Sequence, residues 1–218
     1  MAEELPLFPL DVVLFPGMPL PLHIFEPRYR EMIGLCAREE RPFGVLLIKE
    51  GRDVGPPATP VDVGTMARVV SIDRLEDGRL NIMTVGTQRF RLVNYSAEKQ
   101  SYLVGDVEPI DEETVEPALV APLAAEISSL TLRYITLLQM ASGHELVPFD
   151  LPRSPVDLSF AVGATLRVHN VERQELLQAE STAGRLALEK RLLERESKRI
   201  DELLRQKSSG SLGPFSSN

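Results

Sequence analysis

The chain has 218 residues, of which 43% are hydrophobic and 26% charged, and it carries a formal net charge of −8. This composition is typical of a globular protein with one large or two small domains, and the negative charge argues against a nucleic-acid-binding surface as its main feature. The single cysteine, Cys36, excludes an internal disulfide and a multi-cysteine zinc site. No apolar run reaches the roughly 18 residues of a membrane span, and the acidic start lacks the basic region of a signal peptide, so we expect a cytoplasmic protein.

The first 30 residues combine apolar strand residues with many prolines. We expect strands over residues 11–15 and 20–24, joined by a Pro-Gly-Met-Pro turn. Because proline cannot donate to a sheet ladder, the prolines of this region mark edges, bends or strand ends. A helix then begins at Pro27, since proline suits the first helical turn. Its core-facing stripe is formed by Tyr29, Met32, Ile33 and Cys36.

Short apolar runs continue to about residue 110. The expected strands cover residues 43–48, 64–75, 80–95 and 102–110. A hairpin turn with Asp-Gly at its tip occupies residues 76–79, and Gly86 marks a bulge or a corner between two strands. Residues 49–62 form a polar loop whose role stays open. Together, about seven short strands predict a barrel or a curled sheet.

The apolar period lengthens to that of a helix after residue 115. A long helix begins at Ala118 and ends near Gly143, a second begins after the capping Ser154, and residues 172–179 are helical. A charged last helix has an apolar stripe formed by Leu186, Leu193, Ile200 and Leu204. The predicted division is therefore a strand-rich part over residues 1–115, a helical part over residues 116–207, and a flexible tail over residues 208–218.

Motifs for catalysis are missing from the sequence. There is no nucleophile elbow, no zinc-protease motif and no phosphate loop, so we expect no enzyme and no cofactor. The three histidines His23, His144 and His169 have no close-spaced partners, so no metal site is predicted, and Cys36 is expected to be a buried structural thiol. Arg89 and Arg91 flank Phe90 as in a weak nucleic-acid-binding strand, but the acidic chain favours a solvated outer strand face.

Met18 stands out at the tip of the Pro-Gly-Met-Pro turn. An exposed methionine on a rigid turn beside aromatic residues suits loose apolar recognition. Alternatively, the side chain folds back onto the barrel. The sequence leaves both interpretations open.

Four stretches resemble one known family. LPLFPLDVVLFPGMPLPLHIFEPRYREMI at residues 5–33 is similar to the start of the Lon amino-terminal, or substrate-binding, domain family. The apolar strand FGVLLI, the pattern G-T-x-A-R…D-G…V-x-G-x-x-R-F and the helical end agree in order and spacing, so the resemblance covers residues 5–205. The variant PLHIFEPRYR is closer to short, free-standing members, and the ATPase and Ser-Lys peptidase modules of full-length Lon have no motif here.

The resemblance implies an α+β fold, with an amino-terminal PUA-like β-pseudobarrel followed by a carboxy-terminal α-helical bundle. It also implies a non-catalytic module that binds unfolded or degron-bearing polypeptides or a partner protein. Weak self-association is left open. Binding to nucleic acid or to a membrane is not expected. A barrel edge or the groove between barrel and bundle would take an extended peptide, by strand addition or pocket filling. The candidate contact residues, each of which could instead belong to the core, are Phe15, Met18, Phe25 and Tyr29. The alternatives are a hydrolase with an unrecognised site and an RNA-binding PUA-like protein.

Overall fold

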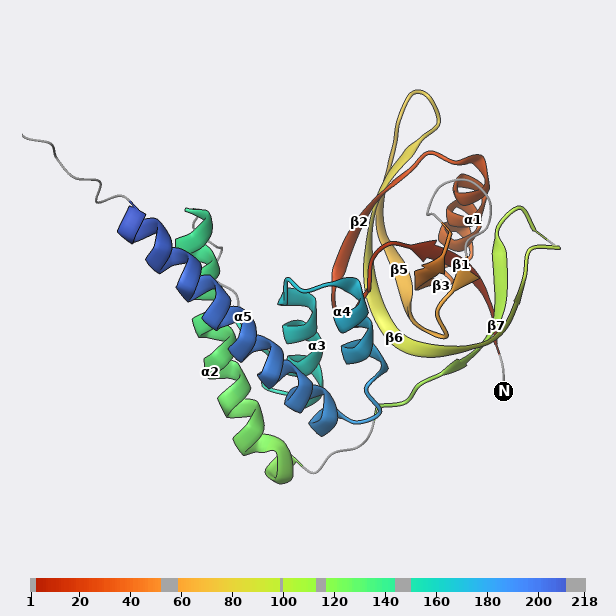
Figure 1. Cartoon of the computed structure of the whole chain (residues 1–218). Coiled ribbons are helices and arrows are strands. Elements are labelled where there is room, and N and C mark those ends of the chain that lie inside the picture. Colours follow the sequence, from red (N-terminus) through yellow and green to blue (C-terminus); the bar gives the residue numbers. More distant parts are fainter. Residues whose placement is uncertain (1–2, 52–58, 99, 113–116, 144–149, 211–218) are drawn as a thin grey trace, which may run out of the picture.

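A computed structural model describes residues 3–51, 59–98, 100–112, 117–143 and 150–210. Strands come first and helices follow, with α1 (Pro27–Arg38) the one described helix among the strands (Figure 1). The predicted α+β architecture is therefore confirmed. The predicted boundary at residue 115 and residues 52–58 of the predicted 49–62 loop lie outside the described residues. The described ends of that loop belong in part to strands, which include residues 49–50 and Thr59–Pro60.

Five strands close into a barrel. They are β1 (Glu3–Leu10), β3 (Phe43–Glu50), β5 (Val63–Arg74), β6 (Leu80–Ser96) and β7 (Leu103–Pro109). β1 pairs with β3 in parallel, and every other contact around the ring is antiparallel. Two shorter strands extend it, β2 (Pro19–Ile24) beside β6 and β4 (Thr59–Pro60) beside β3. Side chains alternate as the sequence predicts, because Leu80 and Ile82 are buried while Asn81 and Met83 face outward.

The first strand differs from the prediction. It covers Glu3–Leu10 and includes two prolines, whereas residues 11–15 form no strand. Pro6 lies where β1 pairs only with β7, and Pro9 lies where it pairs only with β3. Each proline thus has a neighbouring strand on one side alone, where its missing N–H can face away from the ladder.

Residues 11–18 run between the barrel and the helices instead of joining a sheet. Three of their carbonyl groups, those of Asp11, Val13 and Leu14, accept hydrogen bonds from side chains, so these groups need no strand partner. Thr65 Oγ1 donates to Leu14 O at 2.6 Å, and Arg173 Nη2 donates to Val13 O at 3.2 Å. Val13 and Phe15 enter the core under the helices, and Leu14 enters the core of the barrel. We call these residues the 11–18 segment.

Several local predictions in the barrel are confirmed. The stripe of α1 is buried against the barrel core, and Pro27 occupies its first turn. Burial raises the pKa of the Cys36 thiol to about 11, so this thiol is inert at neutral pH. Gly78 has a positive φ of 80° at the hairpin tip. Gly86 lies at a register shift between β5 and β6, although β6 continues through it as one strand.

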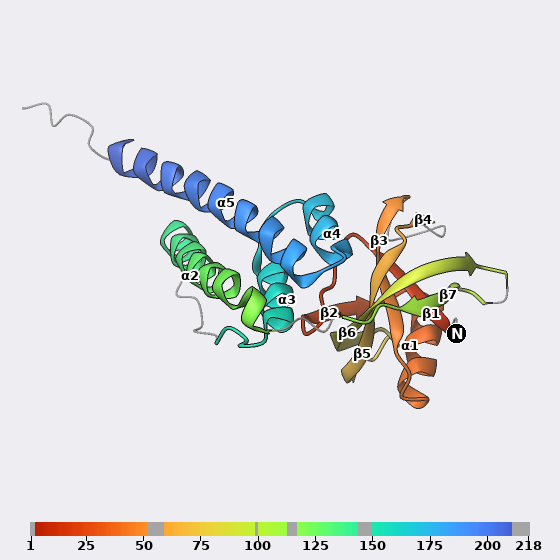
Figure 2. The ribbon, with the colours of Figure 1, turned by 90° about the horizontal axis from the view of Figure 1, so that it is seen from below.

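Four helices follow the barrel. They are α2 (Pro117–Ser142), α3 (Pro155–Thr165), α4 (Asn170–Gln178) and α5 (Thr182–Gly210). α2 and α5 lie side by side, and α3 and α4 lie between them and the barrel (Figures 1 and 2). Ser154 caps α3 as predicted, while α5 runs to Gly210, past the expected start of the tail at Ser208. Among the described residues, no helix combines the length and hydrophobicity needed to cross a bilayer.

One hydrophobic core joins the two parts of the molecule. Its buried residues from the barrel side are Val13, Phe15, Leu47 and Val63. Those from the helices include Ile127, Tyr134, Leu158, Phe160 and Leu186. The helices therefore pack on the barrel through apolar side chains, which fixes the shape of the surface between them.

The contact between Phe15 and α3 depends on a glycine. A methyl group at Gly163 would lie 2.7 Å from Phe15 Cε1, and Phe15 is fully buried. We expect Gly163→Ala to lower the free energy of unfolding by about 1–3 kcal/mol through overpacking, as measured by urea denaturation. Gly34→Ala is the control, because a methyl group added at this position within α1 would meet no atom closer than 3.7 Å. It should leave the free energy of unfolding unchanged or raise it by up to about 1 kcal/mol. Equal effects of the two changes would contradict this packing.

Candidate functional site

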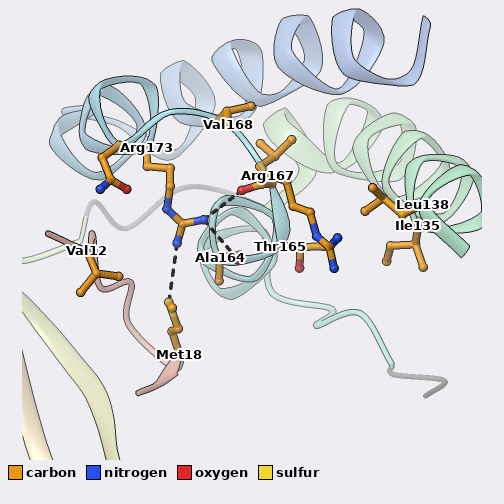
Figure 3. A pocket seen from close by; sticks show the side chains of 11 residues that line it. Val12, Met18, Ile135, Leu138, Ala164, Thr165, Arg167, Val168 and Arg173 are labelled. Carbon is orange, nitrogen blue, oxygen red and sulfur yellow. Dashed lines mark hydrogen bonds between the residues drawn. The ribbon is translucent and has the colours of Figure 1, made fainter. Parts of the chain in front are cut away.

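A groove of about 580 Å³ lies where the 11–18 segment meets the helices (Figure 3). Its described lining is mostly apolar and comes from the 11–18 segment, α2, the end of α3 and the start of α4. These residues are Val12, Met18, Ile135, Leu138, Ala164, Thr165, Leu166, Arg167, Val168, Asn170 and Arg173. The groove thus combines three separate regions of the sequence: the 11–18 segment, α2, and the stretch from the end of α3 to the start of α4.

The wall between α3 and α4 is held by specific hydrogen bonds. The backbone N–H of Arg167 donates to the Tyr134 hydroxyl on α2 at 3.1 Å. Asn170 Nδ2 donates to the Asp11 carbonyl at 3.0 Å and to the Asp11 carboxylate at 2.9 Å. Because these bonds connect the α3–α4 connection to α2 and to the 11–18 segment, they keep the groove preformed.

Arg173 closes one end of the groove. Its guanidinium donates to Leu166 O at 2.9 Å, to Val13 O at 3.2 Å and more weakly to Ala164 O. It also lies 3.8 Å from the sulfur of Met18 and over the ring of Phe15. Burial lowers the pKa of Arg173, but an arginine remains charged at neutral pH. All of these partners are uncharged.

Met18 separates the groove from a second hollow of about 420 Å³. The two hollows share Met18, Ala164 and Thr165, and the second is also lined by Pro152 and Asp157. Met18 is half-buried and packs against the cores of both barrel and helices. Of the two interpretations left open by the sequence, folding back is therefore observed, although part of the side chain still faces the groove.

The four candidate contact residues fall into two pairs. Phe15 and Met18 lie at the groove, but Phe15 is fully buried behind it. Phe25 is 45% exposed and lines a small hollow together with Tyr29, which is buried and stacked on Phe8. The six residues of β2, about 20 Å long, separate the pairs. Met18 and Phe25 are thus the candidates with accessible side chains, and they lie at different places.

The free edge of β2 lacks a hydrogen-bond donor at two of its positions. Gly86 N donates to Met18 O, so the even-numbered residues that follow in the antiparallel ladder direct their main chain toward β6. Pro19 and Pro21 consequently face the other edge, where neither has an N–H. Strand addition is therefore disfavoured here, because an incoming strand needs donors as well as acceptors.

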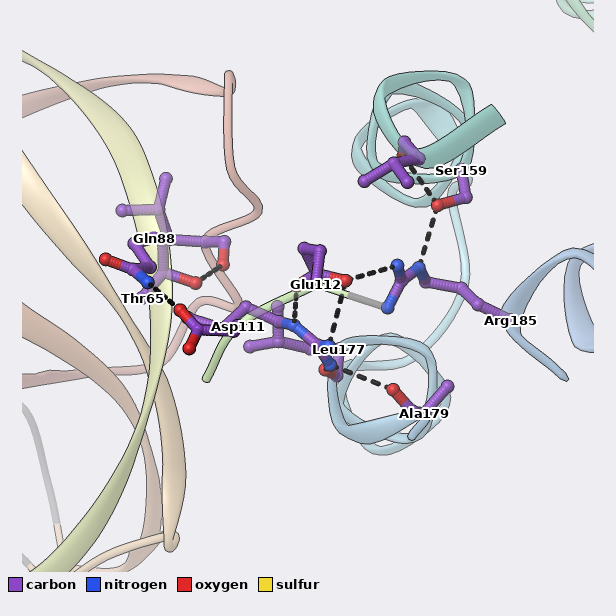
Figure 4. A network of polar contacts seen from close by, with 11 residues as sticks. Thr65, Gln88, Asp111, Glu112, Ser159, Leu177, Ala179 and Arg185 are labelled. Carbon is purple, nitrogen blue, oxygen red and sulfur yellow. Dashed lines mark hydrogen bonds and ion pairs between the residues drawn. The ribbon is translucent and has the colours of Figure 1, made fainter. Parts of the chain in front are cut away.

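Arg89 is buried in an internal network of polar contacts around Glu112, which Figure 4 shows, so the prediction of a solvated outer face was wrong for this residue. Its guanidinium binds both oxygens of Glu112, at 2.6 and 3.1 Å, and donates to the carbonyls of Leu177 and Ala179 at the end of α4. Arg185 on α5 shares Glu112 Oε2 at 3.1 Å. Arg91 is exposed. Arg89 therefore connects barrel to helices and offers no charge to an external phosphate.

The histidines do not converge. His23 contacts Asn81 Oδ1 and Arg79 on the barrel surface, and His169 precedes α4, while His144 lies outside the described residues. Over the ranges that the structure describes, no three His, Cys, Asp or Glu side chains are placed to hold a metal ion. The groove is consequently the candidate site that the described residues support best.

The chain resembles Lon proteases over most of its length. Lon protease 2 of Syntrophobacter fumaroxidans is 28% identical over 189 residues, which cover 85% of this chain and 24% of that protein. The Lon protease of Anaeromyxobacter dehalogenans is 28% identical over 197 residues, or 88% of this chain and 23% of that protein. The chain therefore spans about a quarter of the length of these curated relatives.

Solved structures show the same fold. A Lon N-terminal domain protein from Xanthomonas campestris matches with a TM-score of 0.60 and 29% identity, over 85% of this chain and 95% of that one. The N-terminal domain of the Mycobacterium avium complex Lon protease matches with a TM-score of 0.63 and 19% identity, over 88% of this chain and 98% of that one. The family model of the ATP-dependent protease La (LON) substrate-binding domain matches residues 4–195. Because this match covers most of the chain, the protein belongs to the LON substrate-binding domain family.

Proposed function

We propose that the protein is a non-catalytic module that binds extended segments of unfolded or degron-bearing polypeptides in the groove beside Met18. The observation that carries the proposal is a preformed, mostly apolar hollow between barrel and helices in a chain of this family. Apolar side chains of an unfolded segment would fill the groove, because they lose their contact with water there. A folded protein keeps such side chains in its own core and would bind weakly.

Filling of the hollow is favoured over strand addition. The free edge of β2 lacks the donors at Pro19 and Pro21 that a new strand would need. Met18 offers a flexible, polarisable side chain that can adapt to different apolar partners. Such a surface suits loose recognition of many sequences.

The test is fluorescence anisotropy of a labelled model polypeptide in its unfolded and native forms, without nucleotide. We expect saturable binding of the unfolded form and at least tenfold weaker binding of the native form, which corresponds to about 1.4 kcal/mol. Equal affinity for both forms, or binding to neither, would contradict the proposal.

Met18 should contribute directly to binding. We expect Met18→Ala to weaken binding of the unfolded polypeptide by about tenfold, since truncation of a contact residue typically costs about 1–2 kcal/mol. Met83→Ala, on the outer face of the barrel and away from the groove, is the matched control and should bind like the wild type. Circular dichroism melting accompanies both variants, because Met18 also packs against the two cores. Unchanged affinity of Met18→Ala would exclude Met18 as a contact residue.

A further inference from the structure

The charges of the groove contrast with those of the whole chain. The formal net charge is −8, yet the charged residues in the described lining of the groove are two arginines, Arg167 and Arg173. They lie toward opposite ends of the hollow, with Ala164 and Thr165 between them (Figure 3). The groove is therefore a local basic site on an acidic protein.

Neither arginine has an acidic partner within the described part of the chain. Arg173 is held by backbone carbonyls, the Met18 sulfur and the Phe15 ring. The Arg167 side chain is exposed and forms no ion pair with a described residue. The carboxylate of Asp11 at the rim already accepts a hydrogen bond from Asn170. A half-buried guanidinium that lacks a counter-charge is suited to receive one from a ligand.

We infer that the groove selects polypeptide segments in which a carboxylate lies next to a bulky apolar side chain. This inference rests on the proposed function, and it adds the chemical class of the bound segment. The carboxylate, from an acidic side chain or a free C-terminus, pairs with the exposed side chain of Arg167. The apolar side chain packs against Met18 and, on α2, against Ile135 and Leu138.

The second hollow gives the bound segment a direction. It adjoins the groove at Met18 and is lined by Asp157, whose carboxylate disfavours a second anion there. An acidic group would therefore lie on the Arg167 side of Met18, and a neutral or basic group on the Asp157 side. Charge complementarity of this kind sets orientation and specificity more than overall affinity.

The experiment uses labelled, unstructured peptides that differ at one position beside a leucine. Three carry Glu, Gln or Lys there and have amidated C-termini, and a fourth carries Gln and ends in a free carboxylate after the leucine. We expect the Glu peptide to bind at least about tenfold tighter than the Gln peptide and the Lys peptide to bind weakest. The advantage of the Glu peptide should shrink as salt screens the charges. Tight binding of the fourth peptide would identify a terminal carboxylate as an equivalent ligand.

Variants assign the effect to the groove. Arg167→Gln should remove most of the preference for Glu over Gln, whereas Arg167→Lys should retain part of it. Arg133→Gln, an exposed arginine of α2 outside the groove lining, changes the net charge equally and should retain the full preference. Equal binding of the Glu, Gln and Lys peptides would overturn this inference and leave the proposed function intact. If none of the peptides bound, both this inference and the proposed function would be overturned.

Discussion

Replacing Glu112 by glutamine is expected to lower the free energy of unfolding by about 3 kcal/mol. Arg89 and Arg185 are 2% and 0% exposed, and both bind this one carboxylate. Glutamine keeps the size of the side chain but leaves two buried guanidinium groups without a negative partner. Removing one partner of a buried ion pair typically lowers the free energy of unfolding by about 3–5 kcal/mol. We expect the lower end of this range because the Glu112 side chain is itself 25% exposed.

Asp111 provides the control for this prediction. It precedes Glu112 directly, is exposed, and its carboxylate accepts from Gln88 Nε2 at 3.3 Å. Asp111→Asn changes the formal charge identically and should cost less than about 1 kcal/mol, as exposed polar pairs do. Urea denaturation followed by circular dichroism measures both variants. A loss for Glu112→Gln no larger than that for Asp111→Asn would show that the network is not a stabilising junction.

Glu189→Gln is expected to stabilise the protein increasingly as the pH rises. Glu189 on α5 is fully buried, and neither carboxylate oxygen has a hydrogen-bond partner among the described residues. Burial raises the pKa of this carboxyl well above its ordinary value of 4.5, and the nearby Arg185 only partly opposes the shift. The folded protein therefore holds Glu189 protonated at pH values where the unfolded chain ionises it.

The sign of the pH dependence follows from proton uptake. Below about pH 4.5 both states carry the proton, so this site adds no pH dependence. Above that value the unfolded state loses its proton first, and wild-type stability falls by up to about 1.4 kcal/mol per pH unit until the folded pKa is reached.

Unfolding free energies of wild type and Glu189→Gln, measured between about pH 5 and about pH 8, should diverge accordingly. The exposed Glu202→Gln on the same helix is the control and should remain parallel to the wild type. Parallel curves for all three proteins would contradict a buried, protonated Glu189.

Most elements could be predicted because their signals are local. The period-two pattern of β6, the cap at Ser154 and the stripe of α1 depend on neighbours in the sequence, and the structure confirms each of them. The strand expected at residues 11–15 was wrong because its partners are not local. Its carbonyl groups bind side chains such as Thr65 and Arg173, which are about 50 and 160 residues away.

The candidate site could be predicted only in part. Met18 stood out as an apolar residue on a turn, and it does line the groove. Arg167 and Arg173 were missed because the sequence does not show which residues surround them. Without that information, an arginine that lines a groove cannot be distinguished from one on a solvated surface. Arg89 was misplaced for the same reason, since an arginine on a strand gives no local sign of a carboxylate 23 residues away.

The shared hydrophobic core has a consequence for how the molecule unfolds. The helices bury Val13, Phe15 and Val63, and these residues bury the apolar faces of the helices. If either the barrel or the helical part unfolded alone, the other part would expose its share of this apolar surface to water at a large cost in free energy. Barrel and helices should therefore melt in a single cooperative transition, although the sequence changes character between them. A ligand in the groove contacts both parts and would stabilise the whole unit against unfolding and proteolysis.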